Sequence, residues 1–325
     1  MKIMEKVIRK KLNKKKYNWL ITGSSGFIGT NLVIKLLDLK QKVIGIDIKN
    51  SKIKHENFFF IKGNLLDNTT LKKIPKNLNF VLHQASLTSV QESLEKPASY
   101  LNQNVLSYIK LVEILKTTKI KKLIYASSSA VYGDNNKINF ERKLLNEKNL
   151  LSPYAISKKM IEDYSINTKT SFNKVGLRYF NVYGPHQRIE GDNLPVISNW
   201  INNILLNKNI TIYGNGNSSR NYIYIDDVVN ANIMSALMVN QSEILNICSQ
   251  NKLSLNDLKK EILYLTKKLD INYRKFPIYK KSRYGDIRSS HGSNRLSKKK
   301  INFSEANFFK ICLVKTFEWQ KKYIK

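Results

Sequence analysis

A glycine-rich segment near the start of the chain constrains the fold more than any other feature. Residues 21–29 read ITGSSGFIG and place Gly23, Gly26 and Gly29 three residues apart, directly behind the apolar residues 19–21. This spacing predicts a strand that ends, a chain that turns sharply and a helix that begins. We expect Gly23 to make the turn, Gly26 to let a pyrophosphate approach the backbone and Gly29 to let the helix pack on the strand. The phosphate would then meet unpaired N–H groups at the helix N-terminus.

Asp47 indicates what this turn binds. It ends the predicted strand at residues 42–46, about twenty residues beyond the glycines, where a carboxylate can accept hydrogen bonds from the hydroxyls of an adenosine ribose. A carboxylate there should also repel a 2′-phosphate. The order of strand, turn, helix, strand and acid therefore predicts NAD rather than NADP as the cofactor.

Strands and helices alternate through the first half of the chain. Strands are predicted at residues 19–21, 42–46, 58–61, 80–83 and 122–126, and helices at residues 31–39 and 100–116. Such alternation predicts a parallel sheet that is covered by helices on both faces. Before the first strand, the spacing of Ile3, Val7, Ile8 and Leu12 predicts a short amphipathic helix within residues 1–17.

Charge and cysteine content bound the possible partners. The net charge of +32 would suit a nucleic-acid surface, but the lysines are spread along the whole chain. Lys, Asn and Ile are residues of A/T-rich codons, so we attribute the charge mainly to genome composition and expect no nucleic-acid partner. Cys248 and Cys312 give no framework of bridges or metal ligands, which fits a reducing cytoplasm. No apolar run approaches the roughly 20 residues of a membrane span, and no signal peptide is expected.

Tyr154 and Lys158 form the first candidate for chemistry. They lie four residues apart, so on a helix they share one face. A nearby cation stabilises a phenolate, and moving a tyrosine pKa from about 10 towards 7 needs roughly 4 kcal/mol, which would make a general base. Tyr264 and Lys268 have the same spacing, but only the first pair follows a helix start, Ser152 and Pro153. We therefore expect the second pair to be an ordinary helix face.

A serine-rich segment supplies the second candidate. Residues 126–133 read ASSSAVYG and follow the strand predicted at residues 122–126. The carboxyl ends of parallel strands border the crevice where such sheets bind ligands, so a hydroxyl there can reach a substrate alcohol. Taken alone, a serine run after a strand is also typical of a capped turn.

Together these motifs resemble the extended short-chain dehydrogenase/reductase family over nearly the whole chain, with its Gly-x-x-Gly-x-x-Gly turn, active-site serines and Tyr-x-x-x-Lys pair. The resemblance implies an α/β fold, a Rossmann-type doubly wound parallel sheet with a smaller C-terminal substrate-binding lobe. It implies an NAD-binding domain over residues 1–183, and a lobe over residues 184–325 from which residues 222–248 return to the Rossmann domain. The cofactor-binding residues that it implies are Gly23, Gly26, Phe27, Ile28, Gly29, Asp47, Asn64, Leu65, Gln84, Ala85, Asn104, Tyr154, Lys158 and Phe180.

Among members of this family, the chain is most similar to bacterial UDP-N-acetylglucosamine 4-epimerases of surface-polysaccharide pathways. The resemblance implies a substrate site made of Ser128, Tyr154, Asn181, Val196, Tyr213, Arg220, Arg283, Asp286 and Ser290, and no metal. Tyr154 would take the proton of the 4-hydroxyl, Lys158 would keep Tyr154 acidic, and Ser128, or its rival Ser129, would relay the proton. Arg220 and Arg283 would clamp the diphosphate.

Substrate choice and alternatives depend on single positions. The resemblance places Ser290 at the pocket wall, where a small residue admits an N-acetyl group, and this favours UDP-N-acetylhexosamines over UDP-glucose alone. A UDP-glucuronate 4-epimerase also fits the serine segment, whereas 4,6-dehydratases need an Asp-Glu pair where Ser129 and Ala130 stand. Asn64 and Asn221 replace the usual acids of the family, which puts cofactor affinity in doubt. From another class, a basic Rossmann-fold protein that binds RNA stays open.

The resemblance also implies a homodimer. Leu101, Val105, Tyr108, Val112 and Leu115 lie at helical spacing on one predicted helix. Such a stripe is commonly part of the core, but in this family the helix pairs with the tyrosine-bearing helix across a two-fold contact. We therefore predict a homodimeric, cytoplasmic enzyme that uses NAD.

Overall fold

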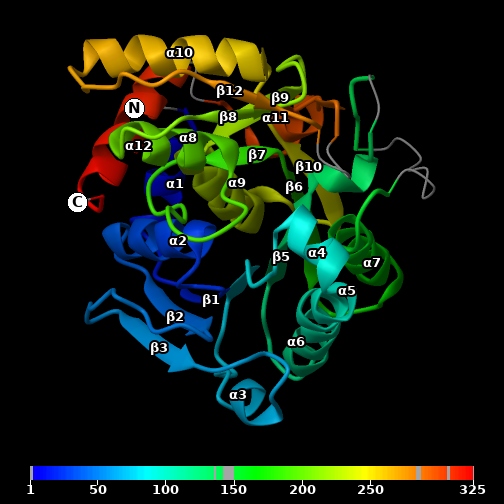
Figure 1. Ribbon diagram of the computed structural model, residues 1–325. Coiled ribbons are helices and arrows are strands. Elements are labelled where there is room, and N and C mark those ends of the chain that lie inside the picture. The colour runs from blue at the N-terminus through cyan, green and yellow to red at the C-terminus, as the bar shows by residue number, and fades with distance from the viewer. Residues whose placement is uncertain (1–2, 135–136, 142–149, 283–286, 306–307, 325) are drawn as a thin grey trace.

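A computed structural model describes residues 3–134, 137–141, 150–282, 287–305 and 308–324 of the chain (Figure 1). The strands are β1 (Asn18–Thr22), β2 (Lys42–Asp47), β3 (Phe58–Lys62), β4 (Phe80–His83), β5 (Lys122–Ser128), β6 (Asn173–Tyr179), β7 (Asn181–Tyr183), β8 (Thr211–Tyr213), β9 (Ser219–Tyr224), β10 (Glu243–Ile247), β11 (Lys252–Ser254), β12 (Ile278–Lys280) and β13 (Ser289–Ser290). The α-helices are α1 (Ile3–Leu12), α2 (Phe27–Asp38), α3 (Asn68–Lys72), α4 (Val90–Glu95), α5 (Pro97–Tyr100), α6 (Ser107–Leu115), α7 (Pro153–Asn167), α8 (Val196–Leu205), α9 (Ile225–Met238), α10 (Leu255–Lys268), α11 (Arg295–Ile301) and α12 (Phe309–Lys321), with a π-helix η1 (Leu101–Leu106) and a 3₁₀-helix η2 (Ser129–Tyr132).

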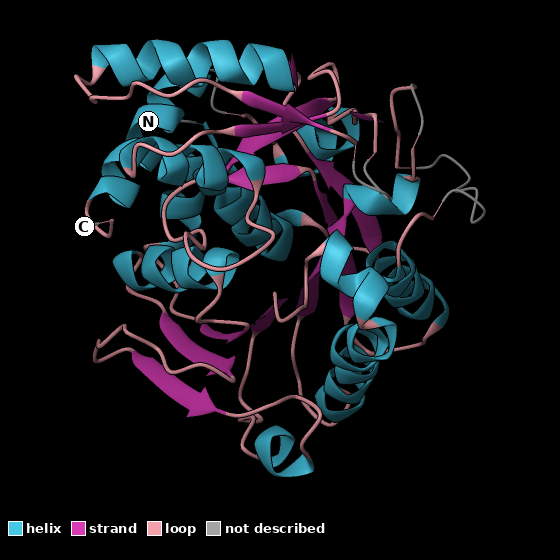
Figure 2. Ribbon diagram, in the orientation of Figure 1, coloured by secondary structure: helices cyan, strands magenta, loops and turns pink. Residues whose placement is uncertain are grey.

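The main sheet has seven strands in the order β10-β6-β5-β4-β1-β2-β3, and every neighbouring pair is parallel. The order runs outward in both directions from β1, so the sheet is doubly wound, as the sequence predicted. Figure 2 shows the strands crossing the lower and central part of the molecule between layers of helices. From β1 the chain continues to β2 on one side, and from β4 it continues to β5 on the other side. Where neighbouring strands connect in opposite directions, a crevice opens at their carboxyl ends.

Strand β1 shows why both faces of the sheet are covered. Its successive residues point to opposite faces, and both faces are buried. Trp19 and Ile21 pack in a core cluster with Leu36 of α2, whereas Leu20 packs in a separate cluster with Leu111 of α6. A strand that is apolar at consecutive positions therefore requires helices on each side.

The second half of the chain forms a smaller unit and also contributes to the main sheet. Strand β9 pairs with β7, β11 and β13, and β8 pairs with β12. Strand β10 instead pairs with β6 in the main sheet, and α9 packs between α1 and α2 on one side of that sheet. Within the described residues, no helix is both long enough and apolar enough to span a membrane.

Two helices differ in detail from the sequence-based expectation. The helix predicted at residues 100–116 is composite, because η1 interrupts α5 and α6 with a π-helical turn. Its predicted stripe lies mostly in the core, since Val105, Tyr108, Val112 and Leu115 are buried, and only Leu101 is exposed. In α1, the buried face is formed by Met4, Ile8 and Leu12, whereas Ile3 is 66% exposed.

Candidate active site

A cavity of about 450 Å³ lies at the carboxyl ends of β4, β5 and β6, and the smaller unit forms its other wall. The predicted site residues that line it are Phe27, Ile28, Gln84, Ser128, Ser129, Tyr154, Lys158, Phe180, Asn181, Val196, Arg220 and Ser290. Predicted site residues that the structure describes outside this lining are Gly23, Gly26, Gly29, Asp47, Asn64, Leu65, Ala85, Asn104 and Tyr213. Arg283 and Asp286 lie outside the described residues.

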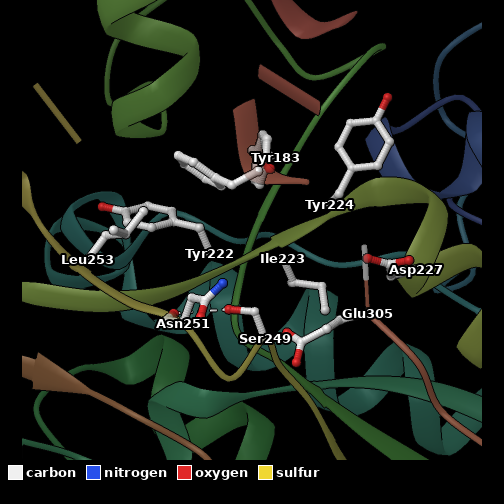
Figure 3. A pocket seen from close by; sticks show the side chains of 10 residues that line it. Tyr183, Tyr222, Ile223, Tyr224, Asp227, Ser249, Asn251, Leu253 and Glu305 are labelled. Atoms are coloured by element: carbon white, nitrogen blue, oxygen red, sulfur yellow. Dashed lines mark hydrogen bonds between the residues drawn. The ribbon is translucent and has the colours of Figure 1, made fainter. Parts of the chain in front are cut away.

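A second, much smaller cavity of about 20 Å³ adjoins the first (Figure 3). It shares Tyr183 and Tyr222 with the large cavity, and Asp227 and Glu305 are among its other lining residues. Tyr154, Lys158 and the serine segment do not line it. The groups that could carry chemistry therefore meet in the larger cavity.

The glycine turn is shaped to admit a phosphate group. Gly23 has a φ of +70°, and a Cβ there would lie 2.6 Å from the backbone nitrogen of Ala85. Gly26 caps α2, whose first residues, Phe27 and Ile28, line the cavity. The first N–H groups of an α-helix have no partner within the helix, and the helix dipole favours an anion there. The turn therefore fits the pyrophosphate of a dinucleotide.

Gly29 closes this turn so tightly that a single methyl group should disrupt it. A Cβ at Gly29 would lie 2.0 Å from the carbonyl oxygen of Gly23. We expect Gly29→Ala to lower the free energy of unfolding by about 1–3 kcal/mol, the usual cost of overpacking, and to reduce the NAD content of the purified protein. Urea unfolding and absorbance of the extracted nucleotide measure the two effects.

Gly26→Ala is the matched control for stability, because a Cβ at that position would lie 3.2 Å from the same oxygen atom. We expect this variant to keep most of its stability. A Gly29→Ala protein with wild-type stability would contradict the tight packing of the turn.

Asp47 lies beside the turn, at the end of β2. Its Oδ2 accepts a hydrogen bond from the backbone N–H of Ser25 at 2.9 Å, and its Oδ1 accepts one from Lys49 at 2.8 Å. Both contacts fix the carboxylate next to the residues that would hold the pyrophosphate. Asn64 makes a local turn instead, because its Oδ1 accepts from the N–H of Leu66 at 3.0 Å. The carboxylate of Asp47 therefore fits the ribose hydroxyls expected from the sequence.

Asn104 connects two segments that border the cavity. Its Oδ1 accepts from the N–H of Leu87 at 2.8 Å, and its Nδ2 donates to Ser157 Oγ at 3.0 Å. It lies in η1, and π-helical turns are frequent at functional sites. Because its amide is committed to these partners, Asn104 holds the loop after β4 against α7.

Gln84 lines the cavity and makes two further polar contacts. Its Nε2 donates to Asn232 Oδ1, and its Oε1 accepts from the hydroxyl of Tyr179, both at 3.1 Å. These bonds join the end of β4 to β6 and α9.

Tyr154, Lys158 and Ser128 meet where α7 crosses the end of β5. Ser152 caps α7, accepting from the N–H of Ala155 at 3.2 Å, as its position before Pro153 predicted. Lys158 Nζ lies 5.9 Å from the ring centre of Tyr154 and donates to the carbonyl of Ala126 at 3.0 Å. Ser128 lies close enough to Tyr154 to lower the pKa of its phenol.

The three serines of the segment have different surroundings. Ser128 Oγ accepts from the N–H of Ala130 at 3.1 Å, which caps η2, and Ser128 also lowers the pKa of the nearby Tyr154 phenol. Ser127 Oγ donates to Glu162 at 2.5 Å. Ser129 Oγ lies 3.4 Å from Ser290 Oγ. Of the three serines, Ser128 is therefore the one that influences Tyr154.

The pKa of Tyr154 differs from the sequence-based expectation. Burial raises its pKa above the ordinary value, and the hydrogen bond with Ser128 offsets only part of that rise. Burial also lowers the pKa of Lys158 to about 7, although Glu162 opposes the shift. Lys158 is thus only partly charged near neutral pH. In the protein without bound ligands, it therefore stabilises the Tyr154 phenolate less than a fully charged lysine would.

This burial of Lys158 predicts a dependence of stability on pH. The unfolded lysine keeps a pKa near 10.5, whereas the folded pKa is about 7, so the unfolded state binds more protons between these values. The free energy of unfolding should therefore rise as the pH increases through this window. We expect Lys158→Met, prepared without NAD, to be more stable than the wild type near pH 7, with the advantage shrinking towards pH 10.

Urea unfolding of both proteins at a series of pH values tests this expectation. Lys122, whose pKa burial also lowers, is present in both proteins, so its contribution cancels in the comparison. If the difference in free energy of unfolding between the wild type and Lys158→Met stays constant with pH, burial does not lower the pKa of Lys158.

The other wall of the cavity holds Arg220 and Ser290. Arg220 donates to the backbone carbonyls of Ser219, at 2.9 Å, and Ile287. Ser290 is buried on β13, opposite the serine segment. Asn181 lines the same side and donates to the carbonyl of Asn221 at 3.2 Å. Among the residues that the structure describes, the smaller unit therefore brings one guanidinium and several small polar groups to the cavity.

Two buried charges next to this site were not identified from the sequence. Glu162 accepts two hydrogen bonds from Arg178, at 2.8 Å and 2.7 Å, and both side chains are almost fully buried. The available signal was that Glu162 follows Lys158 by one helical turn.

The comparisons with known proteins agree with this architecture. The NAD dependent epimerase/dehydratase family matches residues 19–248 of the chain. A putative UDP-glucose 4-epimerase of Methanocaldococcus jannaschii is 34% identical over 275 residues, which cover 82% of this chain and 87% of the relative.

Two solved structures of similar proteins contain bound sugar nucleotides. The UDP-N-acetylglucosamine 4-epimerase from Methanobrevibacter ruminantium M1, in complex with UDP-N-acetylmuramic acid, has a TM-score of 0.84 and 34% identity, covering 95% of this chain and 99% of the other. The UDP-glucuronic acid 4-epimerase from Bacillus cereus, in complex with UDP-glucuronic acid and NAD, has a TM-score of 0.83 and 26% identity, covering 94% and 99%. Proteins with the same fold thus act on different UDP-sugars.

Proposed function

The chain belongs to the NAD dependent epimerase/dehydratase family, and we propose that it inverts carbon 4 of a UDP-sugar, with UDP-N-acetylglucosamine as its preferred substrate. The observation that carries the proposal is the meeting of Tyr154, Lys158 and Ser128 in one cavity, opposite Arg220 and Ser290. UDP-sugar 4-epimerases among the similar proteins support the reaction class.

Some residues of this site would bind the cofactor, and others would act on the sugar. When bound, NAD supplies the hydride acceptor that an unactivated C4–H bond needs, because a carbanion at that carbon would have no stabilisation. The glycine turn and Asp47 hold the pyrophosphate and the adenosine ribose. Tyr154, as the phenolate, takes the proton of the 4-hydroxyl, and Ser128 orients that hydroxyl and relays the proton. Lys158 stabilises the phenolate.

Charge within the cavity supports a neutral sugar over a uronic acid. Among the described lining residues, Lys158 and Arg220 are the cationic side chains. Lys158 lies beside Tyr154, and we assign Arg220 to the diphosphate. A glucuronate carboxylate would then find no dedicated cation among the described lining residues, and losing water without a paired charge is costly in a buried site.

The size of Ser290 supports an N-acetylhexosamine over a plain hexose. Its hydroxyl donates a hydrogen bond to Ser129 Oγ at 3.4 Å, so the two side chains are in contact where β13 meets the serine segment. Both side chains are small and line the cavity, so they leave room beside them for a substituent at carbon 2. The product would be UDP-N-acetylgalactosamine, made in the cytoplasm for the synthesis of surface polysaccharide.

We further propose that the enzyme is a homodimer joined through α7 and the helical segment η1. The stripe predicted from the sequence is mostly core, but its member Leu101 is exposed on these helices, together with Leu106, Ile156 and Met160. An apolar face of this kind is typical of a self-complementary two-fold contact. Sedimentation of the purified protein distinguishes a dimer from a monomer.

A time course followed by NMR tests the function. The purified protein is incubated in parallel with UDP-N-acetylglucosamine, UDP-glucose and UDP-glucuronate, without added NAD. We expect inversion of UDP-N-acetylglucosamine to be fastest, and expect copurified NAD to support it, because the reaction is redox-neutral. If no sugar inverts after NAD is supplied, the epimerase proposal is wrong, and salt-sensitive RNA binding becomes the property to test.

A further inference from the structure

A buried ion pair lies directly behind the candidate active site, outside the residues that line its cavity. Glu162 of α7 is 1% exposed and Arg178 of β6 is 3% exposed. The guanidinium donates two parallel hydrogen bonds to the carboxylate, from Nε at 2.8 Å and from Nη2 at 2.7 Å. Burying two charges is costly unless each is fully hydrogen-bonded, and hydrophobic residues would often be at least as stable there. Stability alone therefore does not account for this pair.

The pair lies where α7, β5 and β6 meet. Ser127 of β5 donates to Glu162 Oε1 at 2.5 Å, and Ser127 is the register partner of Arg178 across the β5–β6 ladder. One turn earlier on α7, Lys158 donates to the carbonyl of Ala126 at 3.0 Å. Helix α7 is thus attached to two successive residues of β5. The next residue of that strand is Ser128, which faces Tyr154.

The other end of the guanidinium fixes the turn that follows the serines. Arg178 Nη1 donates to the hydroxyl of Tyr132 at 2.7 Å, and that hydroxyl donates to Asn246 Oδ1 of β10 at 2.8 Å. The guanidinium carbon also lies 4.7 Å from the centre of the Tyr132 ring. The same arginine therefore holds both α7 and the segment Ser129–Tyr132 against the sheet.

We propose that Glu162 and Arg178 are a positioning pair for the proposed epimerase: they hold Tyr154 and Lys158 of α7 against Ser128 of β5 and keep a carboxylate one turn from the Lys158 ammonium. This inference rests on the proposed function for its effect on turnover. A small displacement of reacting groups can lower the rate about a hundredfold. A rigid attachment of α7 to β5 would prevent such a displacement.

The charge of Glu162 acts on Lys158 in a defined direction. Within the described part of the chain, the titratable groups found around the ammonium are Tyr154 and Glu162 on its own helix and His83 on β4. His83 is neutral at physiological pH, because burial and the charge of Lys158 lower its pKa to about 3. Glu162 is thus the group that opposes the loss of the Lys158 proton on burial.

Glu162→Gln tests the proposal, because it keeps the side-chain shape and removes the charge. We expect kcat with the UDP-sugar that the wild type inverts to fall by about ten- to a hundredfold, with KM changed by less than about threefold. The titration of Lys158, followed by ¹³C NMR of its Cε and assigned with Lys158→Met, should move to lower pH by about one unit. A merely structural role would not move that titration.

Glu5→Gln is the matched control. Glu5 accepts a hydrogen bond from Lys35 at 3.0 Å between α1 and α2, away from the cavity. The substitution breaks an ion pair by the same chemical change, and we expect kcat and the Lys158 titration to stay at their wild-type values. Arg178→Lys is the second variant in case Glu162→Gln does not fold. It keeps the cation but loses the planar fork, and we again expect at least about a tenfold fall in kcat.

The outcomes separate this proposal from the proposed function. If the wild type inverts no UDP-sugar, the function is wrong, but the Lys158 titration in Glu162→Gln still tests the pair. A wild-type kcat in both variants, or a fall in kcat with an unmoved Lys158 titration, would overturn the positioning role.

Discussion

Replacing Tyr154 by phenylalanine should lower kcat by about a thousandfold or more while leaving the binding of the UDP-sugar nearly unchanged. The variant keeps the ring that packs edge-on against Tyr100, at 6.5 Å between ring centres, and removes only the hydroxyl that faces Ser128. General-base catalysis contributes about 10² to 10⁴ in rate, and the 4-hydroxyl proton would have no other acceptor of this kind. Steady-state kinetics give kcat, and calorimetric titration with the UDP-sugar gives the affinity.

Tyr264→Phe is the control that the chain itself offers. Tyr264 and Lys268 have the same spacing on α10 as Tyr154 and Lys158 on α7, but Tyr264 is exposed and lies under Lys310. We expect this variant to retain wild-type kcat. If Tyr154→Phe also kept a kcat within about tenfold of the wild type, the assignment of Tyr154 as the base would be wrong.

Replacing Ser290 by tyrosine should change which sugar is accepted. Ser290 is buried, lines the cavity and donates a hydrogen bond to Ser129. A larger side chain there would fill the space that we assign to the N-acetyl group, and overpacking of about 1–3 kcal/mol corresponds to a loss of about 5- to 150-fold. We expect kcat/KM for UDP-N-acetylglucosamine to fall by that factor, with UDP-glucose affected much less. Parallel assays with the two sugars measure the ratio.

Ser290→Ala is the companion variant for this prediction. It keeps the small size and removes the hydroxyl, so we expect both sugars to react as with the wild type. Equal losses for the two sugars in Ser290→Tyr would indicate general damage to the site and would remove Ser290 as the determinant of substrate choice.

The local patterns that predicted the fold were those in which sequence and backbone are directly connected. A glycine at position 23 predicted a tight turn, because glycine readily adopts a positive φ. The structure shows this turn, with a positive φ at Gly23 and the backbone of Ala85 close to its Cα. The apolar run of β1 predicted a sheet covered on both faces, and Trp19 and Leu20 pack into separate clusters. The start of α7 followed from Ser152 and its capping bond.

The features that could not be predicted depend on contacts between distant segments. The pairing of Ser127 with Arg178 requires the register of β5 and β6, and the contact of both with Glu162 requires the placement of α7 on that ladder. A spacing of four residues indicated that Tyr154 and Lys158 share a helix face, but their pKa values depend on burial, which the spacing does not contain. For the same reason, Leu106, Ile156 and Met160 are exposed although they lie outside the expected stripe, whereas all of that stripe except Leu101 is buried.

The most direct test of the account follows deuterium through the reaction. UDP-N-acetylglucosamine that carries deuterium at carbon 4 is incubated with the purified protein in ordinary water, and substrate and product are examined by NMR and mass spectrometry. If hydrogen leaves carbon 4 and returns as hydride, the UDP-N-acetylgalactosamine that forms should retain the deuterium at carbon 4. Inversion with loss of deuterium to the solvent would contradict a hydride mechanism, and the absence of inversion would contradict the proposed activity itself.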